Sequence, residues 1–154
     1  MRPTLRRALV IVLTGAALGL AANAVSPRRI PYITPPQAKL QPQDIVPLKE
    51  AQELWGNGAA IFLDARLPAD YAAGHIANAF SLPEEEFDEY YPRVAAVLSP
   101  EANIVVYCDG QECDLSHNLA KKLRELRYSH VRILMNGWTA WHTAGLPTHT
   151  GDRP

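Results

Sequence analysis

The sequence is poor in cysteine, and its acidic residues are absent from one end. Only two cysteines, Cys108 and Cys113, occur in 154 residues. This excludes a fold held together by several disulfides and points instead to one local thiol site. Residues 1–40 contain no Asp or Glu, whereas the rest of the chain carries sixteen acidic and nine basic side chains. Because a body with a net charge of −7 repels phosphate backbones, we expect no nucleic-acid partner.

The N-terminal residues have the pattern of a targeting segment. Three arginines precede an uncharged run at residues 8–25, which is long enough for a marginal membrane span. We favour an N-terminal membrane anchor over a signal peptide cleaved near Ala24, and assign residues 1–26 to one or the other. Prolines in the linker, residues 27–42, predict a stiff spacer. In both cases we expect the body to be exported to the periplasm or another extracytoplasmic space.

The body of the chain, residues 43–148, alternates strand and helix signals, and residues 149–154 form a short tail. Apolar runs predict strands at 44–46, 59–63, 79–82, 103–107 and 131–134. Helical spacing predicts helices at 48–55, 68–73, 83–98, 115–126 and 138–144. This order predicts one α/β domain in three layers, a five-stranded parallel sheet flanked by helices. Ligands are then expected where strands end and helices begin.

Cys108 stands where such a fold places its chemistry, because it directly follows the predicted strand 103–107. The loop Asp109-Gly110-Gln111-Glu112-Cys113-Asp114 comes next and leads into a helix. Backbone N–H groups and a helix N-terminus at such a point stabilise a thiolate, a persulfide anion or a bound oxyanion. Position alone does not establish reactivity, since cysteine is also a common core residue.

Three separated segments of the body resemble the motifs of rhodanese domains. They are Leu63-Asp64-Ala65-Arg66 continuing through Gly74-His75-Ile76, Val106-Tyr107-Cys108, and Asn136-Gly137-Trp138 continuing to Pro147. The resemblance covers nearly the whole body and implies the rhodanese-like three-layer fold. It also implies sulfur transfer, in which the Cys108 thiolate takes the outer sulfur of thiosulfate, a polysulfide or a persulfide. A thiol or a cyanide-like acceptor then receives that sulfur. We expect a monomer that needs no cofactor.

The same resemblance implies roles for the residues around Cys108. The loop from Asp109 to Asp114 would surround the transferred sulfur with backbone amides. Asp64 and Arg66 would support the site, with Arg66 either holding an anionic donor or forming a structural ion pair with Asp64. We expect His75 to be a packing residue and not an acid or base.

The loop departs from the family pattern Cys-x-x-Gly-x-Arg-Ser. It is two residues longer, contains no cation, and carries Asp109, Glu112 and Asp114. Negative charges so close together disfavour both a thiolate and a dianionic donor, so we expect thiosulfate to be a poor substrate. Asp114 also stands where the related Cys-x5-Arg phosphatases have arginine, which argues against phosphate chemistry.

Three other functions remain open. Cys108 and Cys113 are close enough in sequence for a disulfide, so the pair can serve as a thiol–disulfide redox module. Cys108, Cys113 and His117 are possible metal ligands, but three ligands among acids are a weak set, and we assign no metal site. The third possibility is a catalytically silent rhodanese-like domain used only for binding.

Overall fold

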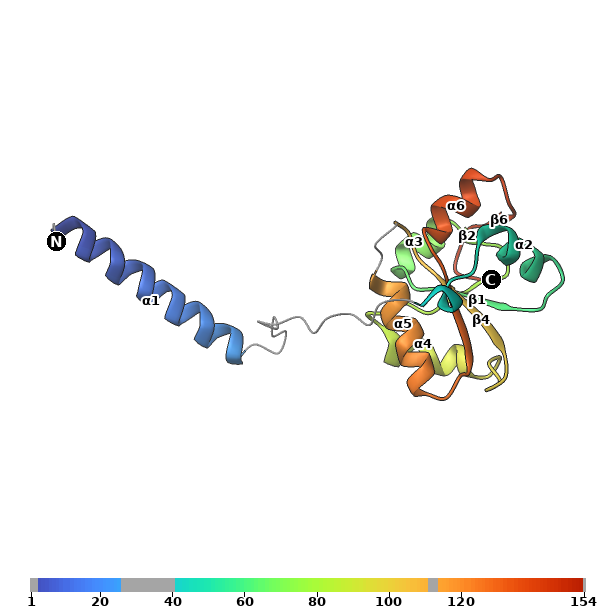
Figure 1. Cartoon of the computed structure of the whole chain (residues 1–154), viewed down its shortest axis with the longest axis horizontal. Helices are drawn as coiled ribbons and strands as arrows, with labels where there is room; N and C mark the ends of the chain where they lie inside the picture. Colours follow the sequence, from blue (N-terminus) through green and yellow to red (C-terminus); the bar gives the residue numbers. More distant parts are fainter. Residues whose placement is uncertain (1–2, 26–40, 111–113, 154) are drawn as a thin grey trace. The chain divides into compact units, whose positions relative to one another are not determined.

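The computed structural model describes residues 3–25, 41–110 and 114–153, which belong to two units, Met1–Lys39 and Leu40–Pro154. In the first unit, helix α1 (Pro3–Val25) contains an 18-residue window, Arg6–Asn23, that is long and apolar enough to cross a membrane (Figure 1). None of that window is buried. Because a signal sequence meets the same criteria, the helix is weak evidence for export and does not separate an anchor from a cleaved signal.

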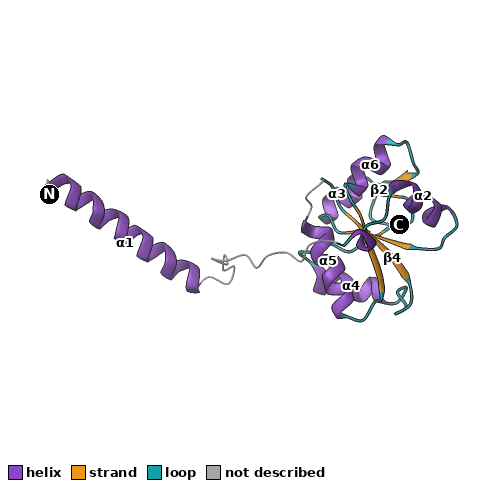
Figure 2. Cartoon of the chain, viewed as in Figure 1, coloured by secondary structure: helices purple, strands orange, loops and turns teal. Residues whose placement is uncertain are grey.

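The second unit alternates helices and strands (Figure 2). Its elements are η1 (Pro42–Asp44), α2 (Leu48–Gly56), β1 (Ile61–Asp64), α3 (Pro68–Ala73), β2 (His75–Ile76), β3 (Phe80–Ser81), α4 (Phe87–Ala95), β4 (Asn103–Tyr107), α5 (Asp114–Glu125), β5 (His130–Leu134), α6 (Gly137–Thr143) and β6 (Thr148–His149). The main sheet has the strand order β3-β1-β4-β5, and every neighbouring pair is parallel. Strands β2 and β6 form a separate antiparallel pair.

The main sheet has four parallel strands, so the expectation of five is wrong. The segment expected as a fifth strand makes a single bridge, from Ile45 to Ile133, and the N–H of Val46 donates to the Ile133 carbonyl at 2.9 Å. Asp44 is already part of the 3-10 helix η1, and Pro47 has no N–H to donate. Too few residues therefore remain between them to build a ladder.

The strands bury both of their faces, because alternate side chains point to opposite sides of the sheet. On one face Leu63, Val106 and Ile133 pack with residues of α4 and α5. On the other face Phe62 and Val105 pack with residues of α2 and α6, so the sheet lies between the two helix pairs (Figure 1). The predicted three-layer α/β arrangement is confirmed. Burial on both faces explains why β1 and β4 are continuous apolar runs.

Helix α4 begins later than its sequence suggests. The acidic run after Pro83 favours a helix from that point, but α4 begins at Phe87. Glu84 is held outside the helix because its N–H donates to the Ala65 carbonyl and its carboxylate pairs with Lys122 at 2.7 Å. Tertiary contacts to β1 and α5 therefore override the local helix signal.

Candidate active site

Cys108 lies immediately after β4, at the carboxyl end of the sheet. Its side chain faces the α5 layer, where it belongs to the apolar cluster that also contains Val106, and the residue is only 1% exposed. A hydrogen bond of 3.3 Å joins its Sγ to the hydroxyl oxygen of Ser116, which is buried near the start of α5. The carbonyl of Cys108 accepts a hydrogen bond from the N–H of Trp138 at 3.1 Å. The sulfur is thus held between the end of β4 and the first turn of α5.

The Cys108 sulfur is disulfide-bonded in this structure. Cys113, the other cysteine of the chain, lies outside the described residues together with Gln111 and Glu112. The expectations for these three residues, including the disulfide across the loop and the ring of amides around the sulfur, therefore also lie outside them. Asp114 is described, and it is the exposed first residue of α5.

The first two residues of the loop are fixed against the segment that follows β5. The Asp109 carboxylate accepts hydrogen bonds from the N–H of Gly110 and from the hydroxyl of Thr139. The Gly110 N–H also donates to the side-chain oxygen of Asn136 at 3.1 Å. The amide of Gly110 is consequently engaged by the side chains of Asp109 and Asn136. Gly110 has φ +86°, a left-handed conformation that favours glycine.

Asp64 and Arg66 form a buried ion pair at the carboxyl end of β1. The Arg66 guanidinium donates through Nε and Nη2 to both carboxylate oxygens of Asp64, with a shortest distance of 2.6 Å. Nη2 also donates to the carbonyl of Gly74 at 2.6 Å, and the guanidinium carbon lies 4.7 Å from the centre of the Trp138 ring. Arg66 was expected either to hold an anionic donor or to form a structural ion pair with Asp64, and the structure shows the ion pair.

Arg66 keeps its positive charge despite its burial. Desolvation alone would lower the pKa of its guanidinium, but the hydrogen bonds and negative charge of Asp64 raise it, with smaller contributions from Tyr107 and Asp109. The net effect is a pKa above the ordinary arginine value. Because most of this stabilisation comes from Asp64, the charge of Arg66 is largely compensated before any substrate arrives.

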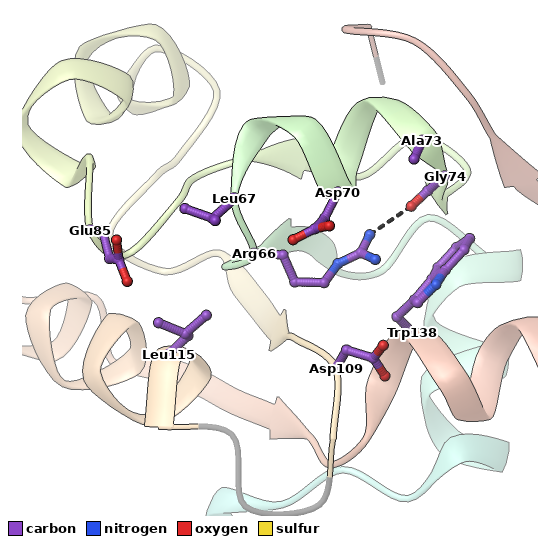
Figure 3. A pocket seen from close by; sticks show the side chains of 9 residues that line it. All are labelled: Arg66, Leu67, Asp70, Ala73, Gly74, Glu85, Asp109, Leu115 and Trp138. Carbon is purple, nitrogen blue, oxygen red and sulfur yellow. Dashed lines mark hydrogen bonds between the residues drawn. The ribbon is translucent and has the colours of Figure 1, made fainter.

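A cavity of about 440 Å³ opens beside the Cys108 loop (Figure 3). The loop contributes Asp109, and Leu115 contributes from the start of α5, so the residues on both sides of the undescribed segment reach it. The other lining residues come from the region between β1 and β2, from the turn before α4 and from α6: Arg66, Leu67, Asp70, Ala73, Gly74, Glu85 and Trp138. In Figure 3, Arg66 lies near the centre of this group, with Asp70 and Asp109 on either side of it.

His75 lies among packed side chains, as expected. It is completely buried, its ring stacks on Tyr71 with centroids 3.7 Å apart, and its Nδ1 donates to the Tyr71 carbonyl at 2.9 Å. It is not among the residues that line the cavity. Within the described part of the chain no group of three or more His, Cys, Asp or Glu side chains is arranged to hold a metal ion.

Sequence reasoning missed several residues that shape the site. The sequence assigns no role to Ser116, which contacts the sulfur, or to Thr139, which donates to Asp109. Asn136 and Trp138 stand in the third motif, but the motif does not predict their contacts with the loop and the cavity. Asn136, Trp138 and Thr139 follow β5 directly. Since β5 neighbours β4 in a parallel sheet, their position after its carboxyl end was the available signal.

Comparisons with known proteins agree with this geometry. The family model of the rhodanese-like domain matches residues 47–144. The solution structure of a rhodanese-like domain from Anabaena is 27% identical, with a TM-score of 0.60, over 71% of this chain and 80% of that one. A thiosulfate sulfurtransferase from Pseudomonas aeruginosa is 26% identical, with a TM-score of 0.57, over 70% of this chain and 20% of that one.

The chain matches only part of the length of its curated relatives. An HTH-type transcriptional regulator from Mycobacterium tuberculosis is 29% identical over 110 residues, which are 71% of this chain and 46% of that protein. The chain therefore spans about half the length of the curated relatives that it matches over most of its length.

Proposed function

Because the chain belongs to the rhodanese-like domain family, we propose that it is a sulfurtransferase that carries a sulfane sulfur as a persulfide on Cys108. The donor is thiosulfate, a polysulfide or a persulfide, and the acceptor is a thiol or a cyanide-like nucleophile. The observation that carries the proposal is the placement of Cys108. It directly follows the central strand β4, and its sulfur contacts Ser116 in the first turn of α5. The cavity of Figure 3 is lined by Asp109 and Leu115, which lie on either side of the undescribed part of the loop.

The reaction begins once an external thiol has reduced the disulfide of Cys108. The thiolate attacks the outer sulfur of a persulfide, a new S–S bond forms on Cys108, and the old S–S bond breaks with its electron pair leaving on the donor thiolate. The acceptor then attacks the outer sulfur of the Cys108 persulfide and regenerates the thiolate. Each half-reaction exchanges one bond to the transferred sulfur for another, so atoms and electrons balance and no cofactor is needed.

Two features stabilise the sulfur anion in this scheme. The Ser116 hydroxyl, 3.3 Å from Sγ, donates a hydrogen bond to the thiolate once the disulfide is reduced. The N-terminal turn of α5 contributes the positive end of its dipole. Asp109 and Asp114 oppose this effect, since both carboxylates lie close to Cys108 in the chain.

A steady-state assay tests the proposal. The full chain is reduced, freed of reductant, and supplied with 2-mercaptoethanol persulfide and cyanide, and thiocyanate is measured. We expect double-displacement kinetics, with parallel reciprocal plots, and loss of turnover in Cys108→Ser but not in Cys113→Ser. Absence of turnover with the native chain would instead favour a silent binding domain.

A second candidate function is a thiol–disulfide redox module, and the disulfide on Cys108 is the observation that favours it. Such a module oxidises a dithiol substrate while its own disulfide is reduced. It requires both cysteines, so Cys113→Ser separates the two functions. Sulfur transfer survives that substitution, whereas redox exchange through an internal disulfide does not.

We also propose that α1 is retained as a membrane anchor and that the rhodanese-like domain works outside the cytoplasm. The support is the exposed apolar window of α1, preceded by arginines that favour a cytoplasmic N-terminus. An oxidising compartment is also where a disulfide on Cys108 persists.

A further inference from the structure

The cavity next to the Cys108 loop is lined by Asp109 of that loop, but not by Cys108 itself, and it carries an excess of negative charge. We propose that it selects the sulfur carrier by charge. Carriers with a positively charged or neutral body, such as an amine-bearing persulfide, are favoured over carriers with a second negative charge, such as thiosulfate. This inference rests on the proposed sulfur transfer and names the substrate class for it.

The charges that line the cavity are unequal. Its described lining contains three carboxylates, from Asp70, Glu85 and Asp109, and one cation, Arg66. The Arg66 guanidinium is already paired with Asp64 at 2.6 Å. The described lining therefore carries more negative than positive charge.

Within the described residues these carboxylates are compensated only in part, since Arg66 attracts Asp109 without forming an ion pair with it. Asp109 accepts hydrogen bonds from two uncharged donors, the Gly110 N–H and the Thr139 hydroxyl. Asp70 and Glu85 are exposed, and among the described residues no cation forms an ion pair with either of them or with Asp109. The negative potential is therefore available to a ligand entering from solvent.

The shape of the cavity suits a small organic carrier. Leu67, Leu115 and Trp138 supply apolar walls that can cover an alkyl stem, while the carboxylates lie around them (Figure 3). Charged clefts with such walls focus their potential and change the local concentration of charged ligands by about 10-fold or more at low ionic strength. The same potential acts against a dianion.

Thiol-specific reagents of opposite charge test the cavity without requiring sulfur transfer. In the reduced Cys113→Ser chain, Cys108 is the only thiol. Its rate of modification is measured by intact mass with 2-aminoethyl and 2-sulfonatoethyl methanethiosulfonate, each normalised to the rate with free 2-mercaptoethanol. Cys108 thiolate attacks the reagent's sulfenyl sulfur, and methanesulfinate leaves. We expect a preference of about 10-fold or more for the cationic reagent, falling as salt is added.

Single substitutions locate the effect. Asp70→Asn and Glu85→Gln should each reduce the preference, whereas Glu101→Gln should leave it unchanged. Glu101 is exposed, lies just before β4 at the end of the sheet opposite to Cys108, and does not line the cavity. Equal normalised rates with the two reagents, or a faster anionic reagent, would overturn the inference.

The same chain is then given persulfides of cysteamine, 2-mercaptoethanol and 3-mercaptopropionate, which differ mainly in the charge of their bodies. We expect Cys108 persulfide to form fastest from the cysteamine compound and slowest from the 3-mercaptopropionate compound. Equal rates would reject charge selection and leave the proposed function standing. Failure of all three donors to form a persulfide, with a charge preference still present in the reagent experiment, would reject sulfur transfer and with it this choice of substrate.

Discussion

Asp64 and Arg66 bury two charges at the carboxyl end of β1, and each depends on the other. Asp64 is completely buried and Arg66 is 6% exposed. Removing one partner of a buried pair leaves an uncompensated charge, which costs far more than the pair itself contributes. The pair therefore fixes the position of Arg66 in the cavity wall.

Asp64→Asn should lower the free energy of unfolding by about 3–5 kcal/mol, because it leaves the Arg66 charge buried without its partner. Urea unfolding of the full chain measures the loss. The matched control is Glu89→Gln, which breaks an exposed pair with Arg93 and should cost at most about 1 kcal/mol. Equal losses in the two variants would contradict the assignment of Arg66 to a structural role.

The residues of the site were partly predictable from the sequence. Cys108, Asp64 and Arg66 stand in motif positions and at strand ends, where a parallel sheet gathers its chemistry. Ser116 and Thr139 were not predictable, because their contacts with Cys108 and Asp109 depend on the angle at which α5 and α6 leave the sheet. No local pattern specifies that angle.

At the scale of elements, α6 approaches β4 closely through Gly137. A Cβ added to Gly137 would lie 2.5 Å from the Cβ of Tyr107 and 3.2 Å from the Leu134 side chain. This contact explains why glycine begins the helix that carries Trp138 and Thr139. A larger residue must push α6 away from the sheet and away from Asp109.

Gly137→Ala should therefore destabilise the domain by about 1–3 kcal/mol. Gly56→Ala is the control, since nothing lies within 4 Å of its added Cβ, and it should be neutral or stabilising by up to about 1 kcal/mol. Both are measured by urea unfolding. An undiminished stability in Gly137→Ala would mean that α6 does not require this close approach.

Helix α4 is tied to the turn after α5 by a pair of tyrosine hydroxyls. The hydroxyl oxygens of Tyr91 and Tyr128 are hydrogen-bonded at 3.0 Å. Burial, together with this hydrogen bond, raises the pKa of Tyr128 to about 12. The folded state thus favours the neutral phenol, so this stabilisation is complete below about pH 10, the ordinary tyrosine pKa, and is lost as the pH rises towards 12.

Tyr128→Phe should accordingly make the unfolding free energy less sensitive to pH between about 10 and 12. The unfolding free energy will still fall at alkaline pH, though less than in the native chain, because burial also raises the pKa values of Tyr71 and Tyr107. The measurement is urea unfolding at several alkaline pH values, beside Tyr91→Phe, which removes the partner hydroxyl. If the unfolding free energy of Tyr128→Phe depends on pH as steeply as that of the native chain, the raised pKa of Tyr128 is refuted.

Most elements of the domain were predictable from periodicity, and the failures have a common cause. β4 and α3 have the predicted bounds, because their apolar runs and turn residues are unambiguous. The segment at 44–46 and the start of α4 were misjudged, since a hydrogen bond from Val46 to β5 and the Glu84 contacts with β1 and α5 decide them. Such tertiary contacts leave no local signal.

At the scale of the whole molecule, an apolar helix and a rhodanese-like domain are joined in one chain. Membrane fractions of cells that express the chain should retain it through alkaline carbonate extraction, because the α1 window is long and apolar enough to span a bilayer. Deletion of residues 1–25 should move the protein to the soluble fraction. Recovery of the undeleted chain in the carbonate wash would contradict the proposed anchor.

The central proposal is that Cys108 carries the transferred sulfur, and intact-mass measurement of single-cysteine chains tests it most directly. The reduced Cys113→Ser chain is exposed to 2-mercaptoethanol persulfide, and its mass is recorded before and after addition of cyanide. The proposal predicts a gain of one sulfur atom that cyanide reverses, and no gain in Cys108→Ser. A sulfur gained equally by Cys108→Ser, or by neither chain, would contradict it.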